Sequence, residues 1–147
     1  MLLSSACEYG LRASLYLATL RPEGYVPVRK ISEALDISSA FLTKIFQQLT
    51  RAGLVRSFKG PTGGVSFARS PSKISVKDII LAIDGDKLFR GCVLGLPGCG
   101  EQKPCPLHDE WAAERGRLET IFTEMTIQYL SENVERFDGR LKPMPLV

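Results

Sequence analysis

The sequence predicts a mainly α-helical protein with one two-stranded hairpin, and three observations lead to this fold class. Through the first 84 residues, apolar side chains recur every three or four positions, which is the period of amphipathic helices. Two short runs of alternating character flank the turn KGPTGG, whose glycines and proline are typical of a tight reversal. After a cysteine-rich loop, one long apolar stripe predicts a long helix. The 147 residues suffice for one domain with its own core.

Two helices are expected before residue 36. Residues 5–20 place Tyr9, Ala13 and Leu17 on one face, and the segment RPEG ends this stripe. A shorter apolar stripe starts at Val28, which is not a capping residue. The two segments predict a long first helix and a short second one.

The third and fourth helices have clearer boundaries. Ser38 can accept hydrogen bonds from the amides of the first turn, and Gly53 supplies the left-handed residue that commonly ends a helix. A fourth helix is expected from Ser75, another capping residue, to Asp84. The apolar stripe of the third helix consists of Leu42, Ile45, Phe46 and Leu49.

Helix, short helix, helix and hairpin, in that order, predict a winged helix-turn-helix over residues 1–84. In this fold the third helix enters the major groove of DNA, and the hairpin, or wing, lies along the backbone. No carboxylate occurs between Asp36 and Asp78, and the basic residues of that stretch suit a phosphate backbone. The alternative interpretation is that these polar residues form an ordinary solvated surface that does not bind DNA. The candidate DNA contacts are Ser38, Ser39, Thr43, Lys44, Gln47, Arg56, Lys59 and Gly60.

Three of the four cysteines and the only histidine lie within residues 92–108. Thiolates and a neutral imidazole bind both iron-sulfur clusters and zinc, so the candidate ligands are Cys92, Cys99, Cys105 and His108. The surrounding glycines let the backbone fold around a metal. We therefore expect residues 85–108 to form a cysteine-rich loop whose ordering is linked to metal binding. By spacing alone, iron-sulfur, zinc and free or disulfide-forming thiols all remain open.

Residues 109–137 are expected to form one long helix, followed by a flexible tail at 138–147. A domain of this size cannot cover so long an apolar stripe, and the economical partner is the same helix of a second copy. The sequence thus predicts a homodimer with a long C-terminal dimerisation helix. The stripe consists of Trp111, Leu118, Ile121, Phe122, Met125, Tyr129 and Leu130.

Several other classes of protein are disfavoured. No apolar run approaches the roughly 18 residues of a membrane span, so no membrane association is expected. The apolar N-terminus lacks a basic start and is interrupted by Glu8 and Arg12, which favours a structural helix over a signal peptide. We expect a cytoplasmic protein, where reductants disfavour disulfides. An enzyme or thiol redox protein is disfavoured because the chain has a single histidine and no CxxC pair.

The segments YGLRASLYLA, KISEALDISSAFLTKIFQQLTRAGLVRSFKGPTGG and ISVKDIILAIDG, with three cysteines before the long helix, resemble a known family. It is the IscR, NsrR and RirA family of winged-helix iron-sulfur transcription regulators. The resemblance covers nearly the whole chain up to the tail, and the run from the third helix through the wing is its most specific part. It implies a dimer that binds a near-palindromic operator, and it favours an iron-sulfur cluster over zinc.

The resemblance also implies two competing ligand sets. IscR-like members have a histidine shortly after the third cysteine, which His108 matches, and this arrangement implies a 2Fe-2S cluster; a 4Fe-4S cluster is the alternative. NsrR-like members use an acidic residue near the N-terminus of the partner subunit, where Glu8 stands. Six residues separate Cys92 from Cys99, one more than the usual IscR spacing. Cys7 has no counterpart in the triad and is interpreted as a small core residue, with a ligand or redox thiol as the alternative.

Together these features predict a non-enzymatic DNA-binding transcription regulator, a repressor whose operator affinity depends on the state of its cluster. Its signals would be iron and sulfur status, oxidants or nitric oxide. The alternative is a cluster-free or zinc-stabilised winged-helix repressor with thiol-based redox sensing.

Overall fold

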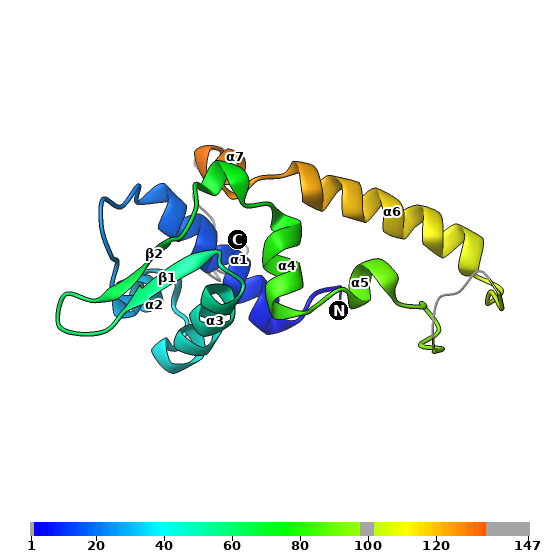
Figure 1. Cartoon of the computed structure of the whole chain (residues 1–147), viewed down its shortest axis with the longest axis horizontal. Helices are drawn as coiled ribbons and strands as arrows, with labels where there is room; N and C mark the ends of the chain where they lie inside the picture. Colours follow the sequence, from blue (N-terminus) through cyan, green and yellow to red (C-terminus); the bar gives the residue numbers. More distant parts are fainter. Residues whose placement is uncertain (1, 98–101, 135–147) are drawn as a thin grey trace, which may run out of the picture.

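The computed structural model describes residues 2–97 and 102–134, and it has the predicted winged-helix architecture (Figure 1). Helices α1 (Ser5–Thr19), α2 (Val28–Leu35) and α3 (Ser39–Arg51) precede a hairpin of β1 (Val55–Phe58) and β2 (Gly64–Phe67). The short 3-10 helix η1 (Pro71–Lys73) and helix α4 (Val76–Ile83) follow. The remaining helices are α5 (Lys87–Arg90), α6 (His108–Glu124) and α7 (Ile127–Glu132).

The helix boundaries depend on the side chains that the sequence predicts. The Ser38 side chain accepts a hydrogen bond from the Phe41 amide at the start of α3, and Gly53 ends the helix with a φ of 75°. Ser75 forms a reciprocal capping box with Asp78, in which each side chain accepts from the other residue's backbone N–H. Local capping residues therefore set the boundaries of these confirmed helices, in addition to tertiary packing.

The main core lies where α3 packs between α1, α4 and β1. The α3 stripe is buried as predicted, and Phe46 is 1% exposed. Leu17 of α1 and Ile79 of α4 complete this cluster from the two flanking helices. The core therefore holds α3 by one face and leaves its polar face outside.

The wing is an antiparallel hairpin in which Val55 pairs with Phe67 and Phe58 pairs with Gly64. An isolated bridge joins Val26 to Val65 and adds the segment before α2 to this sheet. Gly64 has a φ of 152°, and a Cβ there would lie 2.1 Å from the Val26 carbonyl oxygen. Glycine is required at this position because the two backbones approach so closely.

The prediction of one continuous helix over residues 109–137 is wrong. Helix α6 ends at Glu124, Thr126 adopts an extended backbone with φ −89° and ψ 155°, and α7 then begins. Residues 135–147, which include the end of the predicted helix and the whole tail, lie outside the described residues. Helix α7 turns back onto the body and packs against α1, whereas α6 extends away from it (Figure 1).

Backbone pairing with the start of α4 explains the break between α6 and α7. The Val76 amide donates to the Met125 carbonyl at 2.9 Å, and the Ile127 amide donates to the Ile74 carbonyl at 2.8 Å. Ile127 is fully buried in the core, which stabilises the fold by about 1.5–3 kcal/mol. Thr126 caps α7 by accepting from the Tyr129 amide. These gains offset the helical hydrogen bonds lost at the break.

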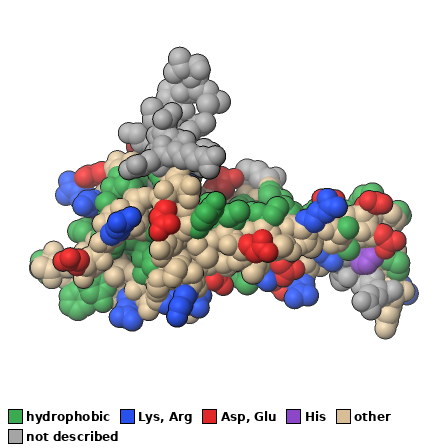
Figure 2. All heavy atoms as spheres, turned by 90° about the horizontal axis from the view of Figure 1, so that it is seen from above, with side chains coloured by type: hydrophobic (Ala, Val, Ile, Leu, Met, Phe, Trp, Pro, Cys, Tyr) green, Lys and Arg blue, Asp and Glu red, His purple; other side chains and the backbone are tan. Residues whose placement is uncertain are grey.

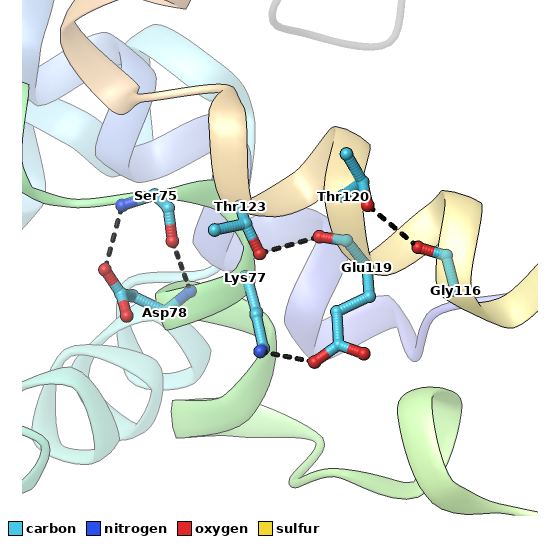
Figure 3. Close-up of polar contacts among 7 residues, drawn as sticks. All are labelled: Ser75, Lys77, Asp78, Gly116, Glu119, Thr120 and Thr123. Atoms are coloured by element: carbon cyan, nitrogen blue, oxygen red, sulfur yellow. Dashed lines mark hydrogen bonds and ion pairs between the residues drawn. The ribbon is translucent and has the colours of Figure 1, made fainter.

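Two contacts join α6 to α4 and α5. The Lys77 ammonium donates to the Glu119 carboxylate at 2.6 Å (Figure 3). The Phe89 and Phe122 rings meet edge to face with centroids 6.5 Å apart, and Lys77 lies 5.5 Å from the centroid of Phe89. Helix α5 was not predicted, because four residues are too few for a periodic pattern. We call this group of Lys77, Phe89, Glu119 and Phe122 the α4–α6 joint.

The ion pair of the joint predicts a pH-dependent stability. The hydrogen bond from Lys77 holds the pKa of the Glu119 carboxyl below its ordinary value. Because the folded pKa is lowered, the contribution is present above the pKa of the unfolded carboxyl and is lost as pH falls through the folded pKa. Lys77→Met should therefore lower the free energy of unfolding by less than about 1 kcal/mol near neutral pH, since the pair is partly exposed.

Urea unfolding of the wild type and Lys77→Met at a series of pH values checks this expectation. The difference between the two proteins should shrink as pH falls below the ordinary carboxyl pKa. Lys87→Met, which replaces an exposed lysine of α5, is the control and should show no such trend. A Lys77→Met difference that stays constant into acid would contradict the assignment.

Candidate DNA-binding face and metal centre

The polar face of α3 is exposed. Ser38, Ser39, Thr43, Lys44 and Gln47 are all on this surface. The Thr43 hydroxyl donates to the Ser39 carbonyl at 2.8 Å, which orients its methyl group and oxygen relative to the helix. With its opposite face packed in the core, α3 can enter a groove without the domain unfolding. The described geometry therefore suits the predicted role of these residues, which stays a prediction.

The wing brings a second exposed basic group to the same half of the molecule. Arg56 is exposed and donates from Nη2 to the Ala68 carbonyl at 3.2 Å. Lys59 and Gly60 lie in the exposed loop between the strands, and Gly60 has a φ of 119°. Such a loop presents cations and backbone amides, which are the groups that bind DNA phosphates.

Aromatic contacts near these surfaces were missed by the sequence analysis. Phe58 at the end of β1 is 54% exposed and lies against Tyr25, with ring centroids 5.5 Å apart. Near the start of α3, Phe41 meets Tyr9 edge to face, and Arg12 lies 4.7 Å from the Tyr9 centroid. Alternation in the strand marks Phe58 as outward-facing but cannot identify its partner, because Tyr25 belongs to a loop.

The cysteine-rich loop brings two predicted ligands together at the far end of α6. The Sγ atoms of Cys92 and Cys105 are 3.7 Å apart. Two sulfurs that each lie about 2.3 Å from one tetrahedral metal are separated by about 3.8 Å, so this pair fits a shared metal, whether iron or zinc. Cys99 lies outside the described residues. Among the residues that the structure describes, no group of three potential metal ligands gathers.

The backbone around Cys92 favours its thiolate. The pKa of the Cys92 thiol is lowered chiefly by the Leu96 amide, then by the Leu94 amide, with smaller help from Cys105. Thiolate is the form of cysteine that binds metal. The preceding residue is fixed to α6, because the Gly91 carbonyl accepts from Trp111 Nε1 at 2.9 Å and from Arg115 at 3.1 Å. The loop is thereby attached to the helix that extends from the body.

The other candidate ligands have different environments. His108 is the first residue of α6 and is half-buried, and its amide donates to the Cys105 carbonyl at 3.0 Å. Glu8 is exposed in the first turn of α1. Cys7 is fully buried in a second hydrophobic cluster with Ile80, as the sequence analysis expected. Burial, with Asp84 and Glu8 nearby, raises the pKa of the Cys7 thiol to about 12, so this thiol stays protonated.

The profile of the Rrf2 family, described as "Iron-dependent Transcriptional regulator", matches residues 3–133. The chain belongs to the Rrf2 family. The transcriptional regulator IscR of Photorhabdus laumondii is 33% identical over 138 residues, covering 94% of this chain and 84% of that protein. Rrf2 proteins of this type are transcription regulators, and so is this one.

Two solved structures resemble the Rrf2 chain in fold. The global cysteine regulator CymR of B. subtilis has a TM-score of 0.73 at 24% identity, covering 88% of this chain and 95% of that one. IscR of T. potens has a TM-score of 0.71 at 25% identity, covering 99% of this chain and 93% of that one. These similarities confirm the winged-helix fold and the predicted resemblance to IscR-type regulators. None of the described helices combines the length and hydrophobicity of a membrane span.

Proposed function

We propose that this Rrf2 regulator is a homodimeric repressor that carries an iron-sulfur cluster and binds a near-palindromic operator in the cytoplasm. Cys92, Cys99 and Cys105 would hold the cluster, with His108 as the fourth ligand and a 2Fe-2S cluster favoured. Glu8 of a second copy is the alternative fourth ligand. The 3.7 Å separation of the Cys92 and Cys105 sulfurs, in a chain related to IscR, is the observation that carries this proposal.

The contacts of α6 support a route from the cluster to the DNA-binding half. When bound, the cluster would tie the cysteine-rich loop together from several points, and Gly91 connects that loop to Trp111 and Arg115 of α6. Further along α6, the α4–α6 joint and the backbone pairing at Met125 connect the helix to α4. Loss of the cluster to oxygen, nitric oxide or iron shortage would then alter the position of α6 relative to α3. A tenfold change in operator affinity needs only about 1.4 kcal/mol.

The surface of α6 supports the proposed dimer. None of its residues is buried, and Ile121 is 49% exposed. Figure 2 shows hydrophobic side chains along this extension between charged ones. A second copy packed against α6 about a twofold axis would cover them. The two α3 helices would then reach successive major grooves about 34 Å apart, and such a dimer would match a near-palindromic operator.

Anaerobic purification with visible absorption spectroscopy and iron and sulfide analysis tests the cluster. The expected result is a coloured protein with iron and acid-labile sulfide in equal amounts. A colourless protein with one tight zinc per chain would defeat the cluster and leave the zinc-stabilised repressor. A protein without metal that binds its operator unchanged would defeat both.

Operator binding by surface variants tests the DNA-binding face. Lys59→Ala should weaken binding to all sequences and lower the salt dependence by about one unit, because it removes one phosphate contact. Thr43→Ala and Gln47→Ala should instead relax base preference by about 1–3 kcal/mol at the affected positions. Titrations of operator and unrelated DNA at several salt concentrations separate the two effects. Lys87→Ala is the control, and unchanged nonspecific binding by Lys59→Ala would refute the wing assignment.

A second candidate function, thiol-based redox sensing without a cluster, is favoured by the same sulfur pair. The Sγ atoms of Cys92 and Cys105 are 3.7 Å apart and would approach to about 2.05 Å in a disulfide. With hydrogen peroxide as oxidant, the two thiols lose two protons and two electrons, one S–S bond forms, and the peroxide becomes two waters. Mass spectrometry of the metal-free protein after peroxide treatment should show this disulfide. If operator affinity follows the disulfide in protein that never held iron, the second function replaces the first.

A further inference from the structure

A pocket of about 720 Å³ lies between the wing and α7, at the opposite end of the molecule from the cysteine-rich loop. Its walls come from the end of α1, strand β2, the residues that lead into η1, and α7. Neither the candidate DNA contacts nor the candidate metal ligands line it. Its volume is within the range of pockets that bind small organic molecules.

One wall carries an arginine whose charge is not matched. Arg21 is exposed, and its guanidinium has no hydrogen-bond or ion-pair partner among the described residues. Its backbone has a φ of 45°, a left-handed conformation that usually requires glycine. Strained non-glycine residues concentrate at functional sites, which makes the Arg21 guanidinium a candidate ligand-binding group.

The facing wall adds a second arginine and one acid. Arg69 is 3.4 Å from the Asp78 carboxylate, and its side chain is 46% exposed, which leaves donors for a ligand. Glu132 of α7 accepts a hydrogen bond from Gln128 at 2.9 Å. The lining therefore holds two guanidinium groups and one carboxylate, and because Arg69 is already paired with Asp78, the guanidinium of Arg21 supplies the unmatched charge that suits an organic monoanion.

We propose that this pocket binds a small organic carboxylate with an apolar body. Arg21 and Arg69 would bind the carboxylate, Ser66 would donate to it, and the half-buried Phe67 would contact the apolar body. Strand β2 belongs to the wing, and α7 follows α6 in the chain. A molecule bound between β2 and α7 therefore links the wing to the end of α6. Its effect on operator affinity rests on the proposed function, whereas the binding itself does not.

Titration of the ¹⁵N-labelled protein by NMR, without DNA, tests the binding. The probes are 3-phenylpropionate, hexanoate and N-acetyl-leucinate, with 3-phenylpropanamide as the neutral control. At least one carboxylate should shift the amide signals of Ser66 and Ser131, and 3-phenylpropanamide should bind at least about tenfold more weakly than 3-phenylpropionate. No binding by any probe, equal binding of acid and amide, or shifts confined to other surfaces would overturn the proposal.

Variants identify the binding groups and separate the two proposals. Arg21→Gln and Arg69→Gln should each weaken carboxylate binding at least about fivefold, while Arg29→Gln on α2 should leave it unchanged. Arg21 is exposed, so its loss leaves the core intact, and the proton spectrum checks folding. Carboxylate binding that survives in both pocket variants would overturn the site. Operator titrations with and without the carboxylate then measure the regulatory effect, and an unchanged affinity would refute only that effect.

Discussion

Cys105→Ser is expected to abolish stoichiometric binding of iron and sulfide. The serine hydroxyl is harder and less acidic than the cysteine thiol, so it is a poor substitute as a ligand. The substitution therefore removes one of the two sulfurs that lie 3.7 Å apart. Iron and acid-labile sulfide measured after anaerobic purification should both fall to the background level. Operator affinity of the variant should equal that of the wild type stripped of its cluster.

The matched control for this prediction is Cys7→Ala. Cys7 is buried in the core with a pKa of about 12, so its removal should leave iron and sulfide at the wild-type level. Retention of full iron and sulfide by Cys105→Ser would show that Cys105 is not a ligand. Equal losses in both variants would point to general destabilisation instead.

Phe46→Ala is expected to lower the free energy of unfolding by about 3–5 kcal/mol. Phe46 is 1% exposed and belongs to the same hydrophobic cluster as Leu17 of α1 and Ile79 of α4. Domains of this size are stable by only about 5–15 kcal/mol, so the variant should be close to unfolding at 37 °C. Urea denaturation followed by circular dichroism measures the change.

Phe58→Ala provides the comparison for this core variant. Phe58 is 54% exposed and contacts Tyr25, so its loss should cost at most about 1 kcal/mol. A similar loss of stability in the two variants would mean that α3 does not form the centre of the core. It would also remove the reason why the polar face of α3 is free to bind DNA.

The elements that the sequence predicts well are those with local causes. Helix α3 has a serine cap, an unbroken apolar stripe and Gly53 at its end, and all three features are present in the structure. The break between α6 and α7 has a tertiary cause. The apolar stripe runs through Met125 without interruption, whereas the backbone pairing with Ile74 and Val76, about fifty residues earlier, and the burial of Ile127 favour the break.

The candidate metal centre likewise has some features that the sequence predicts and others that depend on tertiary contacts. The clustering of Cys92 and Cys105 in the sequence predicts their proximity, because a short loop limits how far apart they can lie. The hydrogen bonds from Trp111 and Arg115 to Gly91 could not be predicted, since the loop must first fold back onto α6. The left-handed conformation of Arg21 carries no sequence signal either, because glycine is the usual residue there.

The attachment of α6 to the body through the α4–α6 joint and the pairing at Met125 has a mechanical consequence. Its 17 residues span about 26 Å, so the helix carries the cysteine-rich loop far from the pairing at Met125. A tilt of about 5° about Met125 would displace the start of α6 by about 2 Å and would strain the hydrogen bonds from Trp111 and Arg115 to Gly91. Under the proposed function, a shift of the body on operator binding would therefore reach the residue beside Cys92, and bound operator should alter how readily the protein loses the proposed cluster.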